Sequence, residues 1–309
     1  MTLVLGSLQL GFLYGILALG IYIAFRILNI PDLTTEGSFT LGLAVSAMGT
    51  LAGHPAAAIL AAALAGAAAG CVTGLLQTKL EIHAVLAGIL TMSALYTINL
   101  VVLGSSSNVS LIGVETMFKA AEESFGCSKE TAKTVISIVS ALICFGLAAV
   151  FFRTHLGLCI RATGDNEAMV SASSINVDAM KITALSFSNA LVAVSGGLIA
   201  QYQGFADVNS GSGMLVVGLA SVIIGEALAG KRGMTVGFLS SMGGSVIYRY
   251  IIAAATKSSF FPAYALKLVS ACIVALALAL PAIRSRMAVR KLKKQRIQAT
   301  ERKEEEQDA

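Results

Sequence analysis

The stretch FFRTHLGLCIRATGDNEAMVSASSINVDAMKI occupies residues 151–182 and separates two long apolar runs. Its centre, from Arg153 to Lys181, is hydrophilic in a chain that is otherwise strongly apolar. A short turn is enough to return one membrane helix into the lipid as the next, because charged loops stay outside the hydrocarbon core. A polar connection of this length therefore predicts that a soluble partner docks at this membrane face.

The composition of the whole chain indicates a membrane protein. Of its 309 residues, 56% are hydrophobic and 13% are charged, and the mean hydropathy is +0.81. In soluble domains about a quarter of the residues are charged, so this chain lacks the polar surface that a soluble fold needs. Hydropathy predicts an all-α polytopic membrane protein with about nine transmembrane helices, in a range of roughly eight to ten. The predicted segments are 4–25, 36–53, 56–78, 83–103, 132–152, 180–200, 213–230, 234–255 and 264–283.

The charges predict which loops face the cytoplasm. Residues 284–309 contain nine Lys or Arg and five Asp or Glu, which is a net +4 of the chain's total of +5. The positive-inside rule makes this tail cytoplasmic and separates it from a transmembrane permease domain over residues 1–283. Alternation of the spans then assigns the remaining loops. The predicted cytoplasmic set is Arg26, Lys79, 153–181 and 231–232, and the predicted outer set is 54–55, 104–131, 201–212 and 256–263.

Small residues form two patterns. Five residues recur at an offset of 176, Gly37, Gly42, Leu43, Ala44 and Gly49 returning as Gly213, Gly218, Leu219, Ala220 and Gly225. The two copies lie five spans apart, which predicts opposite directions of crossing and hence an inverted repeat, with chance recurrence as the alternative. Gly66, Gly70 and Gly74 form a GxxxGxxxG stripe, which is typical of a helix-packing face.

Polar groups inside apolar segments are the candidates for a translocation pathway, because they are costly to bury in lipid. Pro31 and Gly37 indicate a helix break over residues 30–38, where backbone groups can meet a solute. Hydrogen bonding between helices is the alternative role for such groups. The predicted pathway residues are Glu36, Ser38, Asn99, Ser188 and Asn189.

Nucleotide chemistry has no motif in this chain. Residues 225–232 read GEALAGKR and resemble a phosphate-binding loop, but Arg232 stands where the Mg²⁺-binding Ser or Thr is required. The stretch also ends an apolar span and lacks the strand–loop–helix context of that motif. We therefore expect no cofactor, no metal and no catalytic residue in this chain, and any ATP hydrolysis requires a separate partner chain.

Within the hydrophilic stretch, Gly164-Asp165-Asn166 predicts a turn that leads into a short helix from Glu167 to about Ser174. Asp165 or Asn166 can cap this helix, and Asn176 or Asp178 can cap the span that follows. Glu167 lies in the first turn, where a negative charge favours the helix dipole. Such a helix at the membrane face can transmit motion from a partner, and a solvated linker is the alternative.

The run RATGDNEAMVSASSINVDAMKITALSFSNALVAVSGGLIA, residues 161–200, resembles bacterial ABC importer permeases of the branched-chain amino acid and simple-sugar (ribose) type. Those proteins show an R-A-x-G-x-N…A…G-I-N-V pattern in a cytoplasmic loop. The chain departs from it at Ser174, where the family often has glycine. The matching residues are Arg161, Ala162, Gly164, Asn166, Ile175, Asn176 and Val177 here, Asp32, Leu33, Thr34, Gly37 and Ser38 in a D-L-S-x-G-S element, and the segment 218–230.

The resemblance implies a transporter assembled from two permease chains, a cytoplasmic ABC ATPase dimer and an extracytoplasmic substrate-binding protein, in the bacterial cytoplasmic (inner) membrane. It also implies that residues 164–174 form the coupling helix that contacts the ATPase. The predicted ATPase-coupling residues are Arg161, Gly164, Asp165, Asn166, Glu167 and Ala168.

The resulting hypothesis is the permease subunit of an ATP-driven importer for a small solute. The resemblance favours an amino acid, including an aromatic one, and leaves sugars and nucleosides open. An ion-gradient-driven secondary transporter also explains repeats and broken helices. A membrane scaffold that transports nothing is the third alternative.

Overall fold

The computed structural model describes residues 2–126, 128–230 and 233–257, with a few single positions between 268 and 279. Two predicted regions lie outside the described residues, the cytoplasmic pair 231–232 and the tail at 284–309. Of the predicted ninth segment at 264–283, only those single positions are described. In chain order the elements are α1 (Thr2–Tyr22), the π-helix η1 (Ile23–Ile27), α2 (Thr34–Leu51), α3 (Pro55–Thr78), α4 (Ala84–Val102), β1 (Asn108–Ser110), α5 (Met117–Phe125), α6 (Lys129–Phe151), α7 (His155–Asp165), α8 (Glu167–Ala172), α9 (Val177–Gln203), β2 (Phe205–Asp207), α10 (Met214–Ala229) and α11 (Met234–Lys257).

The fold is that of an all-α polytopic membrane protein, and eight of the nine predicted segments coincide with long helices: α1, α2, α3, α4, α6, α9, α10 and α11. Among the described residues, five helices are long and apolar enough to cross a membrane, namely α1 with η1, α3, α4, α6 and α9. The number becomes six if α10 and α11 form one broken span, with a bend of 118° between the two helices. The predicted count of nine is therefore not confirmed.

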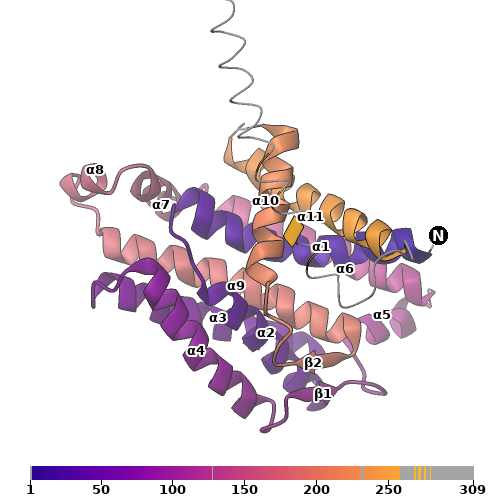
Figure 1. Ribbon diagram of the computed structural model, residues 1–309. Helices are drawn as coiled ribbons and strands as arrows, with labels where there is room; N and C mark the ends of the chain where they lie inside the picture. Colours follow the sequence, from indigo (N-terminus) through magenta and orange to yellow (C-terminus); the bar gives the residue numbers. More distant parts are fainter. Residues whose placement is uncertain are drawn as a thin grey trace, which may run out of the picture.

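Two helices, α1 and α9, form the centre of the bundle and run side by side in opposite directions (Figure 1). Hydroxyl groups of α9 tie them together, since Ser188 Oγ donates to the Gly20 carbonyl at 2.7 Å and Ser195 Oγ donates to the Leu13 carbonyl at 2.8 Å. Both hydroxyls are buried, and an internal acceptor removes the cost of placing them in lipid. Around this pair, α2 and α3 pack against α9, whereas α6, α10 and α11 pack against α1. The helix α4 lies further out, on α2 and α3.

The internal repeat extends over three helices. The order α1, α2, α3 begins at residues 2, 34 and 55, and the order α9, α10, α11 begins at residues 177, 214 and 234. The shifts of 175, 180 and 179 residues agree with the offset of 176 between the glycine patterns. The packing shows the same correspondence. The third helix of each half packs against the first helix of the other half, α3 on α9 and α11 on α1. The opposite directions of α1 and α9 give the repeat an inverted arrangement.

The glycine stripe of α3 is a packing face, as predicted. A Cβ atom at Gly66 or Gly70 would lie 2.4 Å from the Asn189 carbonyl oxygen or 2.3 Å from the Leu185 carbonyl oxygen of α9. Such distances leave no room for a side chain, so the glycines let the two backbones touch.

The loops predicted for opposite membrane faces lie at opposite ends of the bundle. At the end predicted to be outside, β1 pairs antiparallel with β2, and Gln201 Nε2 donates to the Pro55 carbonyl at 2.9 Å. At the other end lie α7, α8 and the α3–α4 turn (Figure 1). The three-residue strands and α5 fall within predicted loops, because elements this short leave no hydrophobic period to detect.

Candidate functional site

The hydrophilic stretch folds into two helices, where the sequence predicts one. The prediction of a turn at Gly164-Asp165-Asn166 is wrong for its first two residues, which form the last turn of α7. The predicted coupling helix is shorter than residues 164–174 and corresponds to α8, Glu167–Ala172. Its predicted cap is confirmed at Asn166, whose Oδ1 accepts from the Met169 N–H at 3.1 Å. The side chain thereby satisfies one of the free N–H groups at the helix start.

Gly164 joins this stretch to the end of α1. A Cβ atom at this position would lie against the Ile27 carbonyl oxygen of η1, at an impossible separation. Asn29 Nδ2 also donates to the Gly164 carbonyl at 3.0 Å. Only glycine lets α7 approach η1 so closely, so Gly164 serves the contact between α7 and α1.

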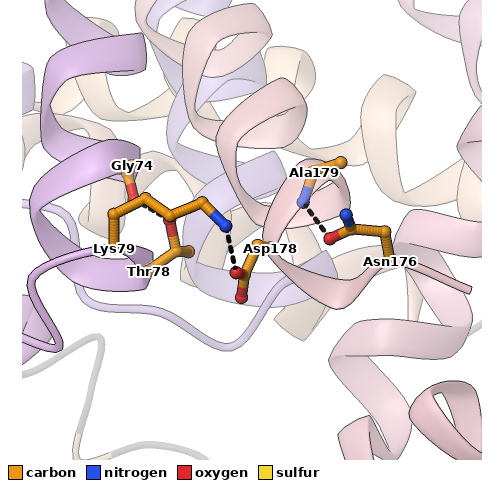
Figure 2. A network of polar contacts seen from close by, with 6 residues as sticks. All are labelled: Gly74, Thr78, Lys79, Asn176, Asp178 and Ala179. Atoms are coloured by element: carbon orange, nitrogen blue, oxygen red, sulfur yellow. Dashed lines mark hydrogen bonds and ion pairs between the residues drawn. The ribbon is translucent and has the colours of Figure 1, made fainter.

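Salt bridges fix the same stretch to α9. Glu167 Oε1 of α8 lies 2.8 Å from Lys181 Nζ of α9. Figure 2 shows the neighbouring contacts, where Asp178 lies 2.8 Å from Lys79 Nζ at the end of α3 and Asn176 caps α9 by accepting from the Ala179 N–H at 3.0 Å. Of the two predicted caps for α9, Asn176 is therefore the one used.

The exposed surface of α8 is small and mixed, and the helix lies at one end of the bundle (Figure 1). Asn166, Glu167 and Ala168 are exposed, and Met169 is 69% exposed. Arg161 and Asp165 are exposed as well and line a hollow of about 270 Å³ between α7, η1, α10 and α11. The structure thus brings together the predicted coupling residues on α7 and α8, with Gly164 facing inward.

An ion pair that the sequence did not predict closes the other side of this hollow. Arg26 of η1 pairs through its Nε with Glu226 Oε1 of α10. The two residues are 200 positions apart and belong to different halves of the repeat. No local pattern in the sequence identifies such a pair, because its members are so far apart in the chain.

Ser174 explains a difference from the family pattern. Its φ angle is +60°, in the left-handed region that glycine adopts without strain and other residues rarely adopt. The glycine that the family often carries at this position therefore has a conformational reason, and serine occupies the position here at a cost.

The five predicted pathway residues do not form one site. Glu36 and Asn99 line a common hollow of about 400 Å³. Ser188 instead holds α9 to α1, so for this residue the alternative of interhelical hydrogen bonding applies. Ser38 is fully buried, and its Oγ has no hydrogen-bond partner among the described residues.

Asn189 belongs to a buried polar cluster whose centre is Asp32. Asp32 is inaccessible to solvent, and its Oδ2 accepts from Asn189 Nδ2 at 2.7 Å while its Oδ1 accepts from the Thr34 N–H at 2.9 Å. Thr34 Oγ1 lies 2.7 Å from Thr73 Oγ1 of α3. Sequence reasoning used Asp32 only as a motif match, although an acidic residue within an apolar region is itself a signal of function.

Comparisons with known proteins agree with this architecture. Residues 3–286 match the family described as "Branched-chain amino acid transport system / permease component". The chain is 36% identical over 238 residues to the "Tyrosine transport system permease protein" of Clostridioides difficile (strain R20291), which covers 77% of each chain. It is 32% identical over 228 residues to "Uncharacterized protein RP368" of Rickettsia prowazekii (strain Madrid E), covering 74% of this chain and 78% of that one.

A solved structure, "PsaBC from Streptococcus pneumoniae in complex with Fab", aligns with a TM-score of 0.53 over 88% of this chain and 89% of that chain. The identity of 15% makes this a likeness of fold alone.

The apolar helices and the family match define the class, which is a multi-pass membrane permease acting as a transport subunit. The chain belongs to the branched-chain amino acid permease family of ABC transport systems. The resemblance inferred from the sequence is confirmed.

Proposed function

We propose that this chain is one of two permease subunits in an ATP-driven importer of the bacterial cytoplasmic membrane. An extracytoplasmic binding protein delivers the solute, and a cytoplasmic ATPase dimer supplies the energy. The tail at 284–309 lies on the cytoplasmic side in this proposal. The solute is an amino acid, and the tyrosine system named for the relative from Clostridioides difficile favours an aromatic one.

The observation that carries the proposal is the rigid attachment of an exposed helix to the centre of the bundle. The tip formed by α8 presents Asn166, Glu167 and Ala168 at one end. Behind it, Gly164 packs on η1 at the end of α1, and Glu167 is paired with Lys181 of α9. A force on α8 therefore acts on α1 and α9, the two helices at the centre of the bundle. This arrangement supports a coupling role more than a solvated linker.

Reconstitution of the chain with its ATPase and binding protein in proteoliposomes tests the proposal. We expect ATP-dependent amino acid uptake, and we expect the double variant Gly164→Trp, Glu167→Lys to insert into the membrane without substrate-stimulated ATP hydrolysis. Normal transport by this variant would refute the coupling role. Glu115→Gln, on the exposed outer loop, is the matched control.

The buried carboxylate of Asp32 gives the ion-gradient alternative a specific observation, because intramembrane acids occur in ion-coupled transport. Uptake that survives ATP depletion and collapses with an ionophore would select that alternative. Absence of any solute flux with all partners present would select the scaffold.

A further inference from the structure

A hollow with a mainly apolar lining and one carboxylate lies between the start of α2, the second half of α4 and the loop that connects β2 to α10. Its volume is about 400 Å³, and the residues that line it include Glu36, Thr40, Tyr96, Asn99 and Asn209. The loop is packed closely on α2, since a Cβ atom at Gly211 would lie 2.2 Å from the Glu36 carbonyl oxygen. The wall of the hollow is therefore set by backbone contacts.

One charged hydrogen-bond acceptor in this hollow lacks a full set of partners. Glu36 is half-buried, and its Oε1 accepts from the Gly213 N–H at 3.0 Å, while no partner is present for its other carboxylate oxygen among the described residues. Asn99 is 1% exposed, and its Nδ2 donates to the Gly37 carbonyl at 3.3 Å. Its Oδ1 is buried behind the wall of the hollow, so the free oxygen of Glu36 is the acceptor available to a ligand that donates.

The charge of the hollow decides which donor it suits. None of the described residues that line it is Lys, Arg or His, so the Glu36 carboxylate has no cationic side chain beside it. An ammonium group has three donors, no acceptor and a positive charge, so it complements a carboxylate oxygen without a partner. Tyr96 and Met92 of α4 line the same space and offer an aromatic face and a flexible apolar side chain.

We propose that this hollow is a solute-binding site for a primary ammonium group, with the Glu36 carboxylate as its acceptor. Under the proposed function, on which this assignment of the solute rests, the group is the α-ammonium of the transported amino acid. Tyr96 and Met92 contact the side chain of the solute. The permease then contributes to selectivity in addition to its binding protein.

Glu36 also has a structural role, because its Oε1 caps the sixteen-residue helix α10 through Gly213. The variant Glu36→Gln separates the two roles. Glutamine keeps an acceptor oxygen for the Gly213 N–H and removes the negative charge. A loss of ligand binding in a stably folded Glu36→Gln protein therefore reports on the charge and not on the cap.

The chain contains no tryptophan, so Tyr96→Trp places a single fluorescent reporter in the hollow. The probes are phenylalanine, phenethylamine, which retains only the ammonium group, and 3-phenylpropanoate, which retains only the carboxylate. Each is titrated into the full-length Tyr96→Trp chain in lipid nanodiscs. We expect a saturable change with phenylalanine and phenethylamine and none with 3-phenylpropanoate. Adding Glu36→Gln raises both dissociation constants at least tenfold, whereas adding Glu115→Gln leaves them unchanged.

Equal binding of 3-phenylpropanoate, or unchanged dissociation constants in Glu36→Gln, overturns the site. A folded reporter that responds to no probe overturns it as well. If Tyr96→Trp does not fold, proteoliposome uptake by Glu36→Gln decides, with a KM raised at least tenfold expected and a wild-type KM contradicting the site. ATP-dependent uptake without binding in the hollow rejects this site and leaves the proposed function intact. Binding in the hollow together with uptake driven by an ion gradient supports this site and rejects the proposed ATP-driven function.

Discussion

The two halves of the repeat share their helix packing and differ in their polar groups. Asp32 and Asn189 form a buried hydrogen bond between the halves. At the offset of 176 residues, the equivalent positions are Val208 and Leu13, which are buried and apolar. The counterpart pair also has one residue in each half and is apolar, so the repeat does not require a polar pair at these positions. The variants described below test whether the Asp32 cluster serves transport.

The close helix contacts, unlike the polar groups, are shared by both halves of the repeat. Between α3 and α9 the glycines lie on α3, at Gly66 and Gly70. At the equivalent contact between α11 and α1, α11 has Met242 and Val246 at these positions, and the glycines are Gly11 and Gly15 of α1. Either helix can supply the small residues, so the repeat retains the closeness of the contact and not the identity of the side chains.

The largest expected effect is at Gly70. In Gly70→Leu, the new side chain overlaps the Leu185 backbone, and backbone cannot move aside as a side chain can. Overpacking of this kind costs about 3 kcal/mol or more. We expect little folded protein in the membrane, measured by detergent-extracted yield and thermal unfolding midpoint.

Gly146→Leu on α6 is the matched control, because nothing lies within 4 Å of a Cβ atom there. Gly11→Leu on α1 tests the equivalent contact between α1 and α11, where the nearest atom would be the Val246 Cα at 2.8 Å, and we expect a smaller loss. Equal yields for Gly70→Leu and Gly146→Leu would show that the α3–α9 contact is not close.

The next effect concerns the polar difference between the halves. Asn189→Leu removes the partner of a buried carboxylate oxygen, which costs about 1–3 kcal/mol. Asp32→Val combined with Asn189→Leu gives this pair the residues of its counterpart in the repeat, Val208 and Leu13. We expect this double variant to recover at least half of the lost stability in thermal unfolding, and to transport poorly.

Transport at the wild-type rate by the folded double variant would make the cluster a structural feature only. A double variant as unstable as the sum of its single variants would contradict the apolar replacement itself, because the two sites would then be independent.

A smaller effect is expected at the ion pair between Arg26 and Glu226. The equivalent positions in the repeat are Tyr202 and Thr50, so this link also lacks a charged counterpart. The side chains are 36% and 21% exposed, and pairs near the surface contribute about 0.5–1 kcal/mol. We expect Glu226→Gln to lower the unfolding midpoint slightly and the charge swap Arg26→Glu, Glu226→Arg to restore part of it. Strictly additive effects in this double-mutant cycle would show that the pair does not interact.

The features that the sequence predicted correctly depend on residues that are close together in the chain. Apolar runs predicted the long helices because each span must satisfy its own backbone within lipid. Asn166 and Asn176 were among the predicted caps because capping depends on residues only three positions apart. The helix α7 was missed, since Gly157 and Gly164 reduce its helical propensity and their use in close packing is not visible locally.

The site depends on contacts between distant residues. Asp32 and Asn189 are 157 positions apart, and Glu36 and Gly213 are 177 apart. Hydrophobic periodicity carries no information on such pairs, so the sequence predicted Glu36, Asn99 and Asn189 as candidates without their arrangement. The repeat was the exception, because a constant offset in one sequence does relate distant helices.

The smallest expected effect is at Ser174, which connects α8 to α9 and has no counterpart in the repeat. Its left-handed backbone costs serine about 1–2 kcal/mol, and glycine avoids this strain while losing about 0.5–1 kcal/mol through a more flexible unfolded chain. We expect Ser174→Gly to stabilise the protein by about 0.5 kcal/mol, the difference between these terms. Ser173→Gly, one residue earlier with a φ of −86°, should instead destabilise it, because glycine gains nothing there. Thermal unfolding of the two variants in parallel measures the difference, and a Ser174→Gly protein less stable than Ser173→Gly contradicts the left-handed assignment.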